Sequence, residues 1–326
     1  MNIIIRPDWY LPESAATDES AYRNRRAFIK TLGLGAVGLV AGCKASNGGA
    51  DMDEDPSTTN GETPPNPNTD LYPAKRNELY TVDRAITPEE YPLAYNNFYE
   101  FSETKDQVQH LVDKFETRPW DIEITGLVNK PVKMTVDELV RALPLEERVY
   151  RFRCVEAWAM TVPWTGIPLA KVLALAEPTS GAKYVRFTSF HRPEQAPNQK
   201  RASWYEWPYY EGLRLDEANN ELAMVVTGLY GKELPKQNGA PIRIITPWKY
   251  GYKSAKSIVS IELTDTQPST FWNDLAPDEY SFLSNVNPEV PHPRWSQATE
   301  RLIDTGERVP TAMYNGYGEY VAGLYT

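Results

Sequence analysis

Cysteine and histidine are scarce in this chain, and the scarcity limits the metal sites that it can build. Its 326 residues include two cysteines, Cys43 and Cys154, and three histidines, His110, His191 and His292. No CxxC, HxxxH or HExxH spacing occurs. A zinc ribbon, a haem-attachment site, an iron–sulfur cluster or a zincin site made from these side chains is therefore excluded. A redox metal in this protein would have to be held mostly by something other than protein side chains.

An excess of basic residues is also absent. Lys and Arg total 34 against 44 Asp and Glu, which gives a formal net charge of -10. Nucleic-acid binding needs a basic surface that neutralises phosphates, so nucleic acid is not expected as a partner. With 41% hydrophobic and 24% charged residues, most of the chain is expected to fold as a soluble globular protein.

The hydrophobic stretch near the N-terminus is too short for a membrane span. Residues 31–43 are uncharged and follow the paired arginines Arg25 and Arg26. As a helix they would reach about 20 Å, whereas the hydrocarbon core of a bilayer is roughly 30 Å thick. The length fits the h-region of a signal peptide, and residues 1–43 resemble a twin-arginine (Tat) export signal. A basic arm before a short buried helix is the alternative.

The same stretch contains two smaller patterns. Residues 33–38 match GxGxxG, but this fingerprint binds a dinucleotide only inside a strand–helix unit with an acidic partner about 20 residues later, so we reject it. Residues 40–43 resemble a lipobox, in which Cys43 would be acylated and become the mature N-terminus. Cleavage by ordinary signal peptidase nearby is the alternative.

Residues 44–78 are predicted to form a disordered, acidic tether rich in Pro, Gly and Asn. They show no apolar period, so they cannot bury enough apolar surface to offset the entropy of ordering. Such a segment would act as a flexible spacer between an anchor and a domain. The folded domain is then expected over residues 79–326.

The patterns within residues 79–326 predict an α+β domain with mixed sheets and long loops. A capping box that starts at Thr135 predicts a short helix over residues 136–142, and a second helix is expected over residues 169–175. Short elements joined by long loops favour α+β over a doubly wound α/β sheet. Alternating or continuous apolar patterns predict strands over residues 120–126, 149–154, 184–190, 223–227, 242–246 and 257–264.

Cys154 ends the strand predicted over residues 149–154 and is the main candidate for chemistry. Arg151 and Arg153 flank it in the sequence, and cationic neighbours favour a thiolate that acts as a nucleophile or a metal ligand. A buried cysteine with no chemical task is the alternative. A Cys–His catalytic pair is weakly supported, because the three histidines lie in loop-like or polar contexts.

The second candidate is a basic segment between Glu233 and Glu262. No acidic residue falls inside it, whereas basic side chains occur at Lys236, Arg243, Lys249, Lys253 and Lys256. Arg can bind a phosphate through two parallel hydrogen bonds, and Lys supplies a point charge. Small residues in the same segment let backbone amides approach an anion. The segment therefore predicts a phosphate-sized anion site, with a surface patch facing anionic lipid headgroups as the alternative.

Six strings, in order along the chain, carry a specific resemblance. They are Tyr-Asn-Asn-Phe-Tyr-Glu-Phe at 95–101, Arg-Phe-Arg-Cys-Val-Glu-Ala-Trp at 151–158, Gln-Asn-Gly-Ala-Pro-Ile-Arg at 237–243, Pro-Trp-Lys-Tyr-Gly-Tyr-Lys-Ser-Ala-Lys-Ser-Ile at 247–258, Asn-Val-Asn-Pro at 285–288 and His-Pro-Arg-Trp-Ser-Gln-Ala-Thr-Glu-Arg at 292–301. From about residue 95 to residue 325 the chain resembles the MsrP (YedY) family, catalytic subunits of periplasmic protein-methionine-sulfoxide reductases with the sulfite-oxidase fold.

The resemblance implies a sulfite-oxidase-type molybdopterin-binding domain and a set of site residues. The family binds one molybdenum through the dithiolene of a single molybdopterin and one protein cysteine, which by resemblance is Cys154, the catalytic residue and metal ligand. A soft thiolate suits such a centre. Ser189 and Ser254 depart from the family pattern, in which Thr and Gly are common. The implied cofactor-binding residues are Asn96, Tyr99, Glu100, Ser189, Asn238, Arg243, Ser254, Ala255 and Lys256.

The function implied by the resemblance is repair of oxidised proteins in the periplasm. Methionine sulfoxide residues of exported proteins would be reduced to methionine by oxygen transfer to molybdenum, a reversible step of sulfur oxidation chemistry. Electrons in the family come from a haem-containing, quinone-linked membrane subunit, MsrQ. A lipid anchor at Cys43 would keep the enzyme near that partner. Two alternatives are a related molybdopterin oxidoreductase acting on another S-oxide or N-oxide, and a non-catalytic exported binding lipoprotein.

Overall fold

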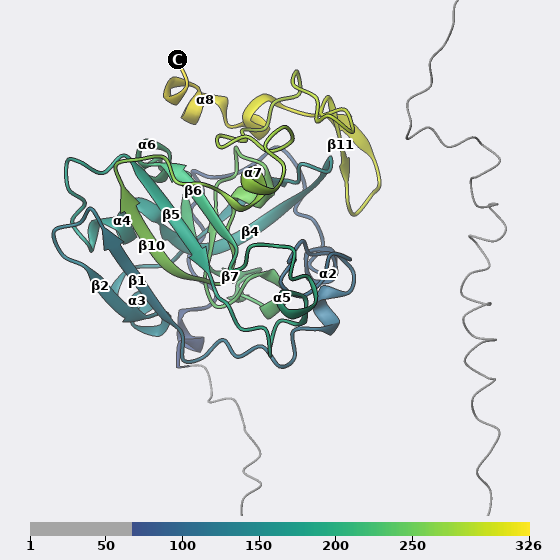
Figure 1. Ribbon diagram of the computed structural model, residues 1–326. Coiled ribbons are helices and arrows are strands. Elements are labelled where there is room, and N and C mark those ends of the chain that lie inside the picture. The colour runs from purple at the N-terminus through teal and green to yellow at the C-terminus, as the bar shows by residue number, and fades with distance from the viewer. Residues whose placement is uncertain (1–66) are drawn as a thin grey trace, which may run out of the picture. The chain divides into compact units, whose positions relative to one another are not determined.

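Two mixed β-sheets form the frame of residues 67–326, which is the part of the chain that the computed structural model describes (Figure 1). The predicted export signal over residues 1–43, its lipobox cysteine Cys43 and residues 44–66 of the predicted tether lie outside the described residues. Short helices and long connections accompany the sheets. The predicted α+β class is therefore confirmed.

The first sheet has five strands, and it pairs strands that are far apart in the sequence. Strands β1 and β10 pair in parallel, and the other neighbours in the sheet are antiparallel. The strands, in spatial order, are β2 (Val132–Thr135), β1 (Asp121–Gly126), β10 (Ile258–Thr264), β5 (Tyr184–Ser189) and β6 (Tyr210–Arg214).

The second sheet has seven strands and is built around β4 (Trp158–Pro168), in which every residue up to Ile167 is buried. Strand β3 (Glu146–Arg153) runs antiparallel along β4, from Arg153 opposite Ala159 to Glu146 opposite Gly166. The remaining strands are β7 (Met224–Leu229), β8 (Lys232–Glu233), β9 (Arg243–Ile245), β11 (Thr299–Leu302) and β12 (Arg308–Pro310). Strand β4 pairs with β3 along one edge and with β7 and β11 along the other, and its buried apolar residues belong to the hydrophobic core.

The helices are short. None in the described region is long and apolar enough to cross a bilayer. The α-helices are α2 (Glu90–Ala94), α3 (Val136–Ala142), α4 (Leu169–Ala174), α5 (Pro197–Arg201), α6 (Leu215–Ala218), α7 (Phe271–Leu275) and α8 (Gly318–Val321).

The predicted elements occur with small shifts at their ends. Helix α3 begins as expected, because the Thr135 side chain accepts a hydrogen bond from the Glu138 amide while the Glu138 carboxylate accepts one from the Thr135 amide. Strand β3 was predicted over residues 149–154, but it begins at Glu146 and ends at Arg153, since Cys154 already belongs to the next turn.

The predicted start of the domain at Leu79 is too late. Residues 67–78 were assigned to the tether, yet they contact the domain at several points. The Tyr72 hydroxyl donates to Oγ1 of Thr227 in β7 at 2.8 Å, and Arg76 pairs with Glu147 in β3 at 2.7 Å. These contacts could not be predicted from the sequence, because single contacting residues in a polar segment produce no periodic hydrophobic pattern.

Two connections place the candidate residues between the sheets. One is the turn from β3 to β4, which carries Cys154. The other is the stretch over residues 246–257, which leaves β9 in the seven-stranded sheet and enters β10 in the five-stranded sheet. Arg243 at the start of β9 and Lys256 at the end of this stretch form an isolated β-bridge. The two candidates from the sequence, Cys154 and the basic segment, thus both lie on connections at the ends of sheet strands.

Candidate active site

Cys154 begins the turn that joins β3 to β4, and the turn is held by backbone hydrogen bonds. The Cys154 amide donates to the Trp158 carbonyl at 3.0 Å, and the Ala157 amide donates to the Cys154 carbonyl at 3.1 Å. Ala157 adopts a left-handed conformation (φ 62°) that lets the chain reverse within this short turn. Cys154 is only 4% exposed and lines a pocket.

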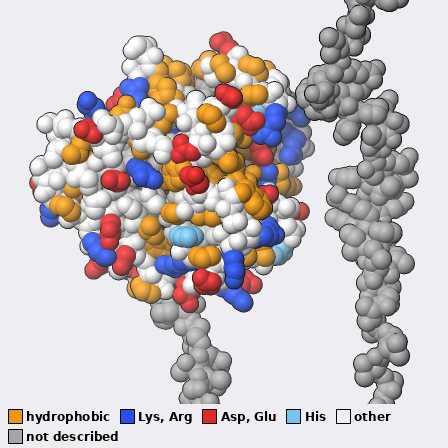
Figure 2. Space-filling model, in the orientation of Figure 1, with side chains coloured by type: hydrophobic (Ala, Val, Ile, Leu, Met, Phe, Trp, Pro, Cys, Tyr) orange, Lys and Arg blue, Asp and Glu red, His pale blue; other side chains and the backbone are white. Residues whose placement is uncertain are grey.

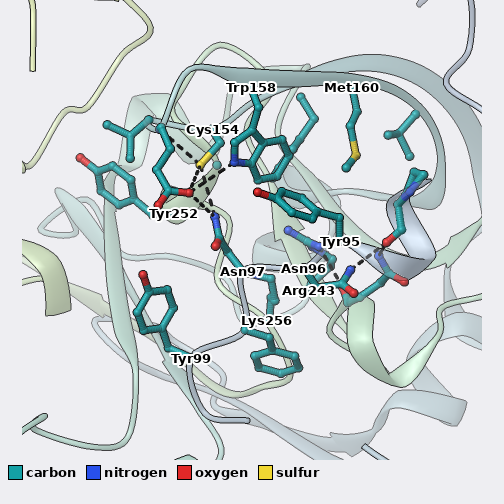
Figure 3. Close-up of a pocket in the computed structure, with 18 of the residues that line it drawn as sticks. Tyr95, Asn96, Asn97, Tyr99, Cys154, Trp158, Met160, Arg243, Tyr252 and Lys256 are labelled. Carbon is teal, nitrogen blue, oxygen red and sulfur yellow. Dashed lines mark hydrogen bonds between the residues drawn. The ribbon is translucent and has the colours of Figure 1, made fainter. Parts of the chain in front are cut away.

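The pocket extends from Cys154 to the cations Arg243 and Lys256 (Figure 3). In this view Asn97 lies between the sulfur and Lys256, while Tyr95 and Trp158 stand along one side. Its walls come from residues 95–100, strands β3 and β4, the region around β9 and β10, and aromatic residues of α7 and the loop after it. The pocket therefore joins parts of the chain that are more than a hundred residues apart.

Three neighbouring groups surround the sulfur of Cys154. The Asn97 side-chain amide donates to Sγ at 3.3 Å, and the Glu156 backbone amide donates to it at 3.5 Å. The thiol itself donates to Oε2 of Glu156 at 3.6 Å. Burial and the Glu156 carboxylate raise the pKa of Cys154 to about 12. A free thiol here is therefore protonated at neutral pH, and a bound soft metal ion is the group that would hold it as a thiolate.

The two arginines beside Cys154 do not serve it in the way that we expected from the sequence. The Arg153 guanidinium is fully buried and donates to Glu300 at 2.9 Å and to Gln297 at 2.8 Å. Arg151 pairs with Asp83. Both side chains are already paired with carboxylates, and the Arg153 guanidinium also donates to the carbonyl of Cys154. The charge of Arg153 still lowers the pKa of Cys154, as expected, but burial and the Glu156 carboxylate raise it by more, so the thiolate is not favoured overall.

Two cations at the other end of the pocket have no carboxylate partner within residues 67–326. Arg243 donates only to the carbonyls of Asn238, at 2.9 Å, and Ser254, at 3.4 Å, and burial lowers its pKa to about 9. The Lys256 ammonium makes no hydrogen bond or ion pair in the described region, and burial together with Arg243 lowers its pKa. Arg243 is buried without an ion pair, which is costly, and the half-buried Lys256 beside it is compensated only in part by Glu100. This end of the pocket is therefore suited to an anion.

The five cations of the basic segment divide into two that face the pocket and three that do not. Arg243 and Lys256 face the pocket. Lys249 is fully buried and pairs with Glu217 at 2.5 Å, and Lys253 is fully buried and pairs with Glu211. Lys236 lies outside the pocket and donates to the carbonyl of Asp113 at 2.9 Å. Only two of the five predicted cations are therefore available to an anion in the pocket.

Side-chain amides supply a further set of unsatisfied groups. The nitrogens of Asn96 and Asn238 both donate to the carbonyl of Pro92, at 2.7 and 2.9 Å. The side-chain oxygens of Asn96, Asn97 and Asn238, and Nε of Arg243, are buried with no partner in the described part of the chain. Buried polar groups are nearly always hydrogen-bonded. Four orphaned polar atoms in one pocket indicate a ligand with several hydrogen-bonding groups.

The predicted site residues fall into an inner and an outer set. Ser189, Ser254 and Ala255 do not line the pocket; the Ser189 hydroxyl donates to the Lys256 carbonyl at 2.7 Å, and the Ala255 carbonyl accepts from the Ile244 amide at 2.8 Å. These residues fix the stretch that carries Lys256. The pocket-lining residues of the prediction are Asn96, Tyr99, Glu100, Cys154, Asn238, Arg243 and Lys256.

Several lining residues were missed by the sequence analysis. Asn97 follows a predicted residue directly and could have been included on adjacency alone. Trp272 and Tyr280 lie more than a hundred residues from Cys154, and no local pattern links them to it. Glu100, which the sequence predicts, lines the pocket and is buried, and burial raises its pKa.

The residues of the pocket fit a molybdenum–pterin group. Cys154 offers one soft ligand, the amide oxygens can accept N–H bonds from a heterocycle, and Arg243 with Lys256 can bind a phosphate. Within residues 67–326 no cluster of three or more His, Cys, Asp or Glu side chains could hold a metal ion. A metal bound at Cys154 therefore needs other ligands from the cofactor itself.

Comparisons with known proteins agree with this reading. The model of the "Oxidoreductase molybdopterin binding domain" family matches residues 109–272. The protein-methionine-sulfoxide reductase catalytic subunit MsrP of Xanthomonas axonopodis pv. citri is 46% identical over 321 residues, which cover 97% of this chain and 95% of that protein. The protein of the same name from Xanthomonas campestris pv. campestris is 45% identical over 320 residues, which cover 96% of this chain and 94% of that protein.

A solved structure is also similar, at a lower level. The sulfane dehydrogenase SoxCD from Paracoccus pantotrophus aligns with a TM-score of 0.41 and 16% identity, over 67% of this chain and 57% of that chain. A likeness this weak carries no argument about the site.

Proposed function

The chain belongs to the MsrP family, the catalytic subunits of protein-methionine-sulfoxide reductases, and from this premise we propose that it reduces methionine sulfoxide residues of exported proteins to methionine. The reaction consumes two electrons and two protons for each sulfoxide, and it releases the sulfoxide oxygen as water. The observation that carries the proposal is the pocket, which has a lone thiol at one end and two unpaired cations at the other.

We propose that one molybdenum on a single molybdopterin occupies this pocket when the enzyme is active. Cys154 would ligate the metal, Arg243 and Lys256 would bind the phosphate, and the amide oxygens of Asn96 and Asn238 would accept hydrogen bonds from the pterin. The bound group supplies two-electron oxygen-atom transfer. Ser189, Ser254 and Ala255 would hold the stretch that presents Lys256, rather than bind the cofactor with their side chains.

The residues around the sulfur are held in place by an ion pair and by hydrogen bonds. Oε2 of Glu156 lies 2.9 Å from Nζ of Lys105 and accepts from the Trp158 indole at 3.3 Å and from Asn97 at 3.5 Å. Burial opposes ionisation of Glu156, but these donors, Lys105 above all, lower its pKa. The carboxylate and the Asn97 amide therefore stay beside the sulfur of Cys154, where they would contact a sulfoxide that reaches this end of the pocket.

Export and electron supply are part of the same proposal. The twin-arginine pattern at Arg25 and Arg26 supports transport of the folded protein to the periplasm. The name "catalytic subunit" of the relatives supports a partner subunit, and we propose a haem-containing, quinone-linked membrane protein of the MsrQ kind. A lipid on Cys43 would hold the enzyme at the membrane near this partner. Replacing Cys43 by Ala should move the protein out of the membrane fraction; an unchanged distribution would count against the anchor.

One experiment separates the proposed activity from its alternatives. The full chain is purified from a host with a Tat pathway, its molybdenum is measured, and reduced viologen is offered as the electron donor. We expect about one molybdenum per chain and reduction of a protein that carries methionine sulfoxide. Turnover of small S-oxides or N-oxides without turnover of the oxidised protein would indicate a related oxidoreductase. Metal-free protein with no turnover would indicate a binding lipoprotein.

A further inference from the structure

A row of aromatic rings leads from the pocket to the protein surface. Tyr99 and Trp272, which both line the pocket, meet edge to face with their ring centres 4.9 Å apart. Tyr205 contacts these two rings at 6.2 and 6.4 Å, and Trp204 contacts Tyr205 at 5.8 Å. Trp204 and Tyr205 lie in the loop between α5 and β6, and Trp272 lies in α7. We call Tyr99, Trp204, Tyr205 and Trp272 the aromatic strip.

The outer end of the aromatic strip, at Trp204, is exposed to solvent. Trp204 is 64% exposed, and it is the only aromatic residue among the large hydrophobic side chains that stand out from residues 67–326. It does not line the pocket. Leu275, in the same helix as Trp272, is also exposed. Figure 2 shows hydrophobic side chains gathered across the middle of the visible face, around the place where Figure 1 puts α7.

The inner end of the strip lies in the wall of the pocket that a substrate must enter. Cys154 is buried, so the reacting side chain has to project into the pocket, and Tyr99 and Trp272 are part of its wall. Tyr99 and Trp272 are both partly exposed, so they can contact the main chain that carries this side chain and stays outside the pocket. Its neighbours along the substrate chain can reach Tyr205 and Trp204, because the strip continues outward without a break.

From this continuity, and resting on the proposed function, we propose that the aromatic strip binds the polypeptide segment that flanks the methionine sulfoxide, and that it selects extended segments with apolar residues beside the sulfoxide. Aromatic rings offer large, rigid contact surfaces that lose little entropy on binding, and they are enriched among the residues that dominate binding energy. Apolar and sulfur-containing side chains pack well against them. The strip thus distinguishes a sulfoxide within a polypeptide from a small free sulfoxide.

The test compares three sulfoxide substrates on the holoenzyme with reduced viologen as donor. The substrates are a peptide with methionine sulfoxide between leucines, the same peptide with glycines and serines in place of leucines, and N-acetyl-methionine sulfoxide amide. The variants are Trp204→Ala, Trp204→Phe as a conservative rescue, and Leu79→Ala as a control. Leu79 is 79% exposed and belongs to neither the strip nor the pocket. Binding of the unoxidised leucine peptide is measured separately by calorimetry on each protein.

We expect Trp204→Ala to raise KM for the leucine peptide about 10-fold and to weaken calorimetric binding by a similar factor. KM and kcat for the small amide should not change, Trp204→Phe should recover most of the loss, and Leu79→Ala should match the parent. Equal KM values of parent and Trp204→Ala for the leucine peptide would overturn the inference, as would an equal loss on the small amide. If no sulfoxide is reduced by any protein, the proposed function fails, and the calorimetric comparison still decides whether the strip binds apolar peptides.

Discussion

Replacing Lys256 by Met should have opposite effects on the empty and the cofactor-loaded protein. The Lys256 ammonium has no hydrogen bond or ion pair within residues 67–326, and Arg243 lies beside it across a β-bridge. In the empty protein this charge is a burden, because burial and Arg243 disfavour it. In the loaded protein the same charge would bind the cofactor phosphate. The variant should therefore be more stable when empty and should retain less cofactor.

The size of the effect follows from the pKa of Lys256. Burial and Arg243 lower it below its ordinary value of 10.5, and each pKa unit corresponds to about 1.4 kcal/mol. Buried lysines shift by up to about 3 to 5 units, but Lys256 is only half-buried and Glu100 partly compensates it. We expect a gain of about 2 kcal/mol at pH 6, or about 4 to 8 °C in the midpoint of thermal unfolding.

The pH dependence has a defined sign. A lysine whose folded-state pKa is lowered destabilises the fold fully below that pKa, and the penalty fades as pH rises toward 10.5. The advantage of Lys256→Met should therefore shrink between pH 7 and pH 10. Thermal unfolding of metal-free protein followed by circular dichroism measures it, and molybdenum per chain after dialysis measures retention.

Lys236→Met is the matched control for this experiment. It removes the same charge from the same basic segment, but Lys236 lies outside the pocket. It should change neither stability nor molybdenum content noticeably. The reasoning would be refuted if Lys256→Met destabilised the empty protein, or if it bound molybdenum as firmly as the parent.

Three further substitutions test the fold around the site by urea denaturation. Glu300→Gln should cost about 3 kcal/mol because it leaves the fully buried Arg153 without its counter-charge; a loss below 1 kcal/mol would mean that this pair is not buried as described. Thr135→Ala should cost about 1 kcal/mol by removing the cap of α3, and an unchanged midpoint would argue against the capping box. Tyr72→Phe should cost about 1 kcal/mol by removing its hydrogen bonds to β7, and no change would place residues 67–78 outside the domain.

The local elements were predictable because their signals lie within a few residues. The box from Thr135 to Glu138 gave the start of α3, and apolar alternation gave strands such as β5 and β10. The order of the strands was not predictable in this way. Strands β1 and β10 pair in parallel although more than a hundred residues separate them, and pairing at such distances depends on the packing of the whole domain.

The candidate site was predictable in its chemistry but not in its electrostatics. Cys154 and the cations Arg243 and Lys256, which the sequence predicts to share a site, line one pocket. Arg153 and Lys249 were misjudged, because their partners Glu300 and Glu217 are remote in the sequence and become neighbours only in the fold. Charge along the chain reveals where cations are, but only the three-dimensional structure reveals which of them lack a counter-charge.

The measurement that tests the central claim most directly is X-ray absorption at the molybdenum edge of the purified holoenzyme, with metal analysis of Cys154→Ser beside it. If Cys154 is the protein ligand, the metal should have two sulfur neighbours from the dithiolene and one from the thiolate, and Cys154→Ser should lose that third sulfur or the metal altogether while remaining folded. An unchanged sulfur count in Cys154→Ser with full molybdenum content would contradict the account.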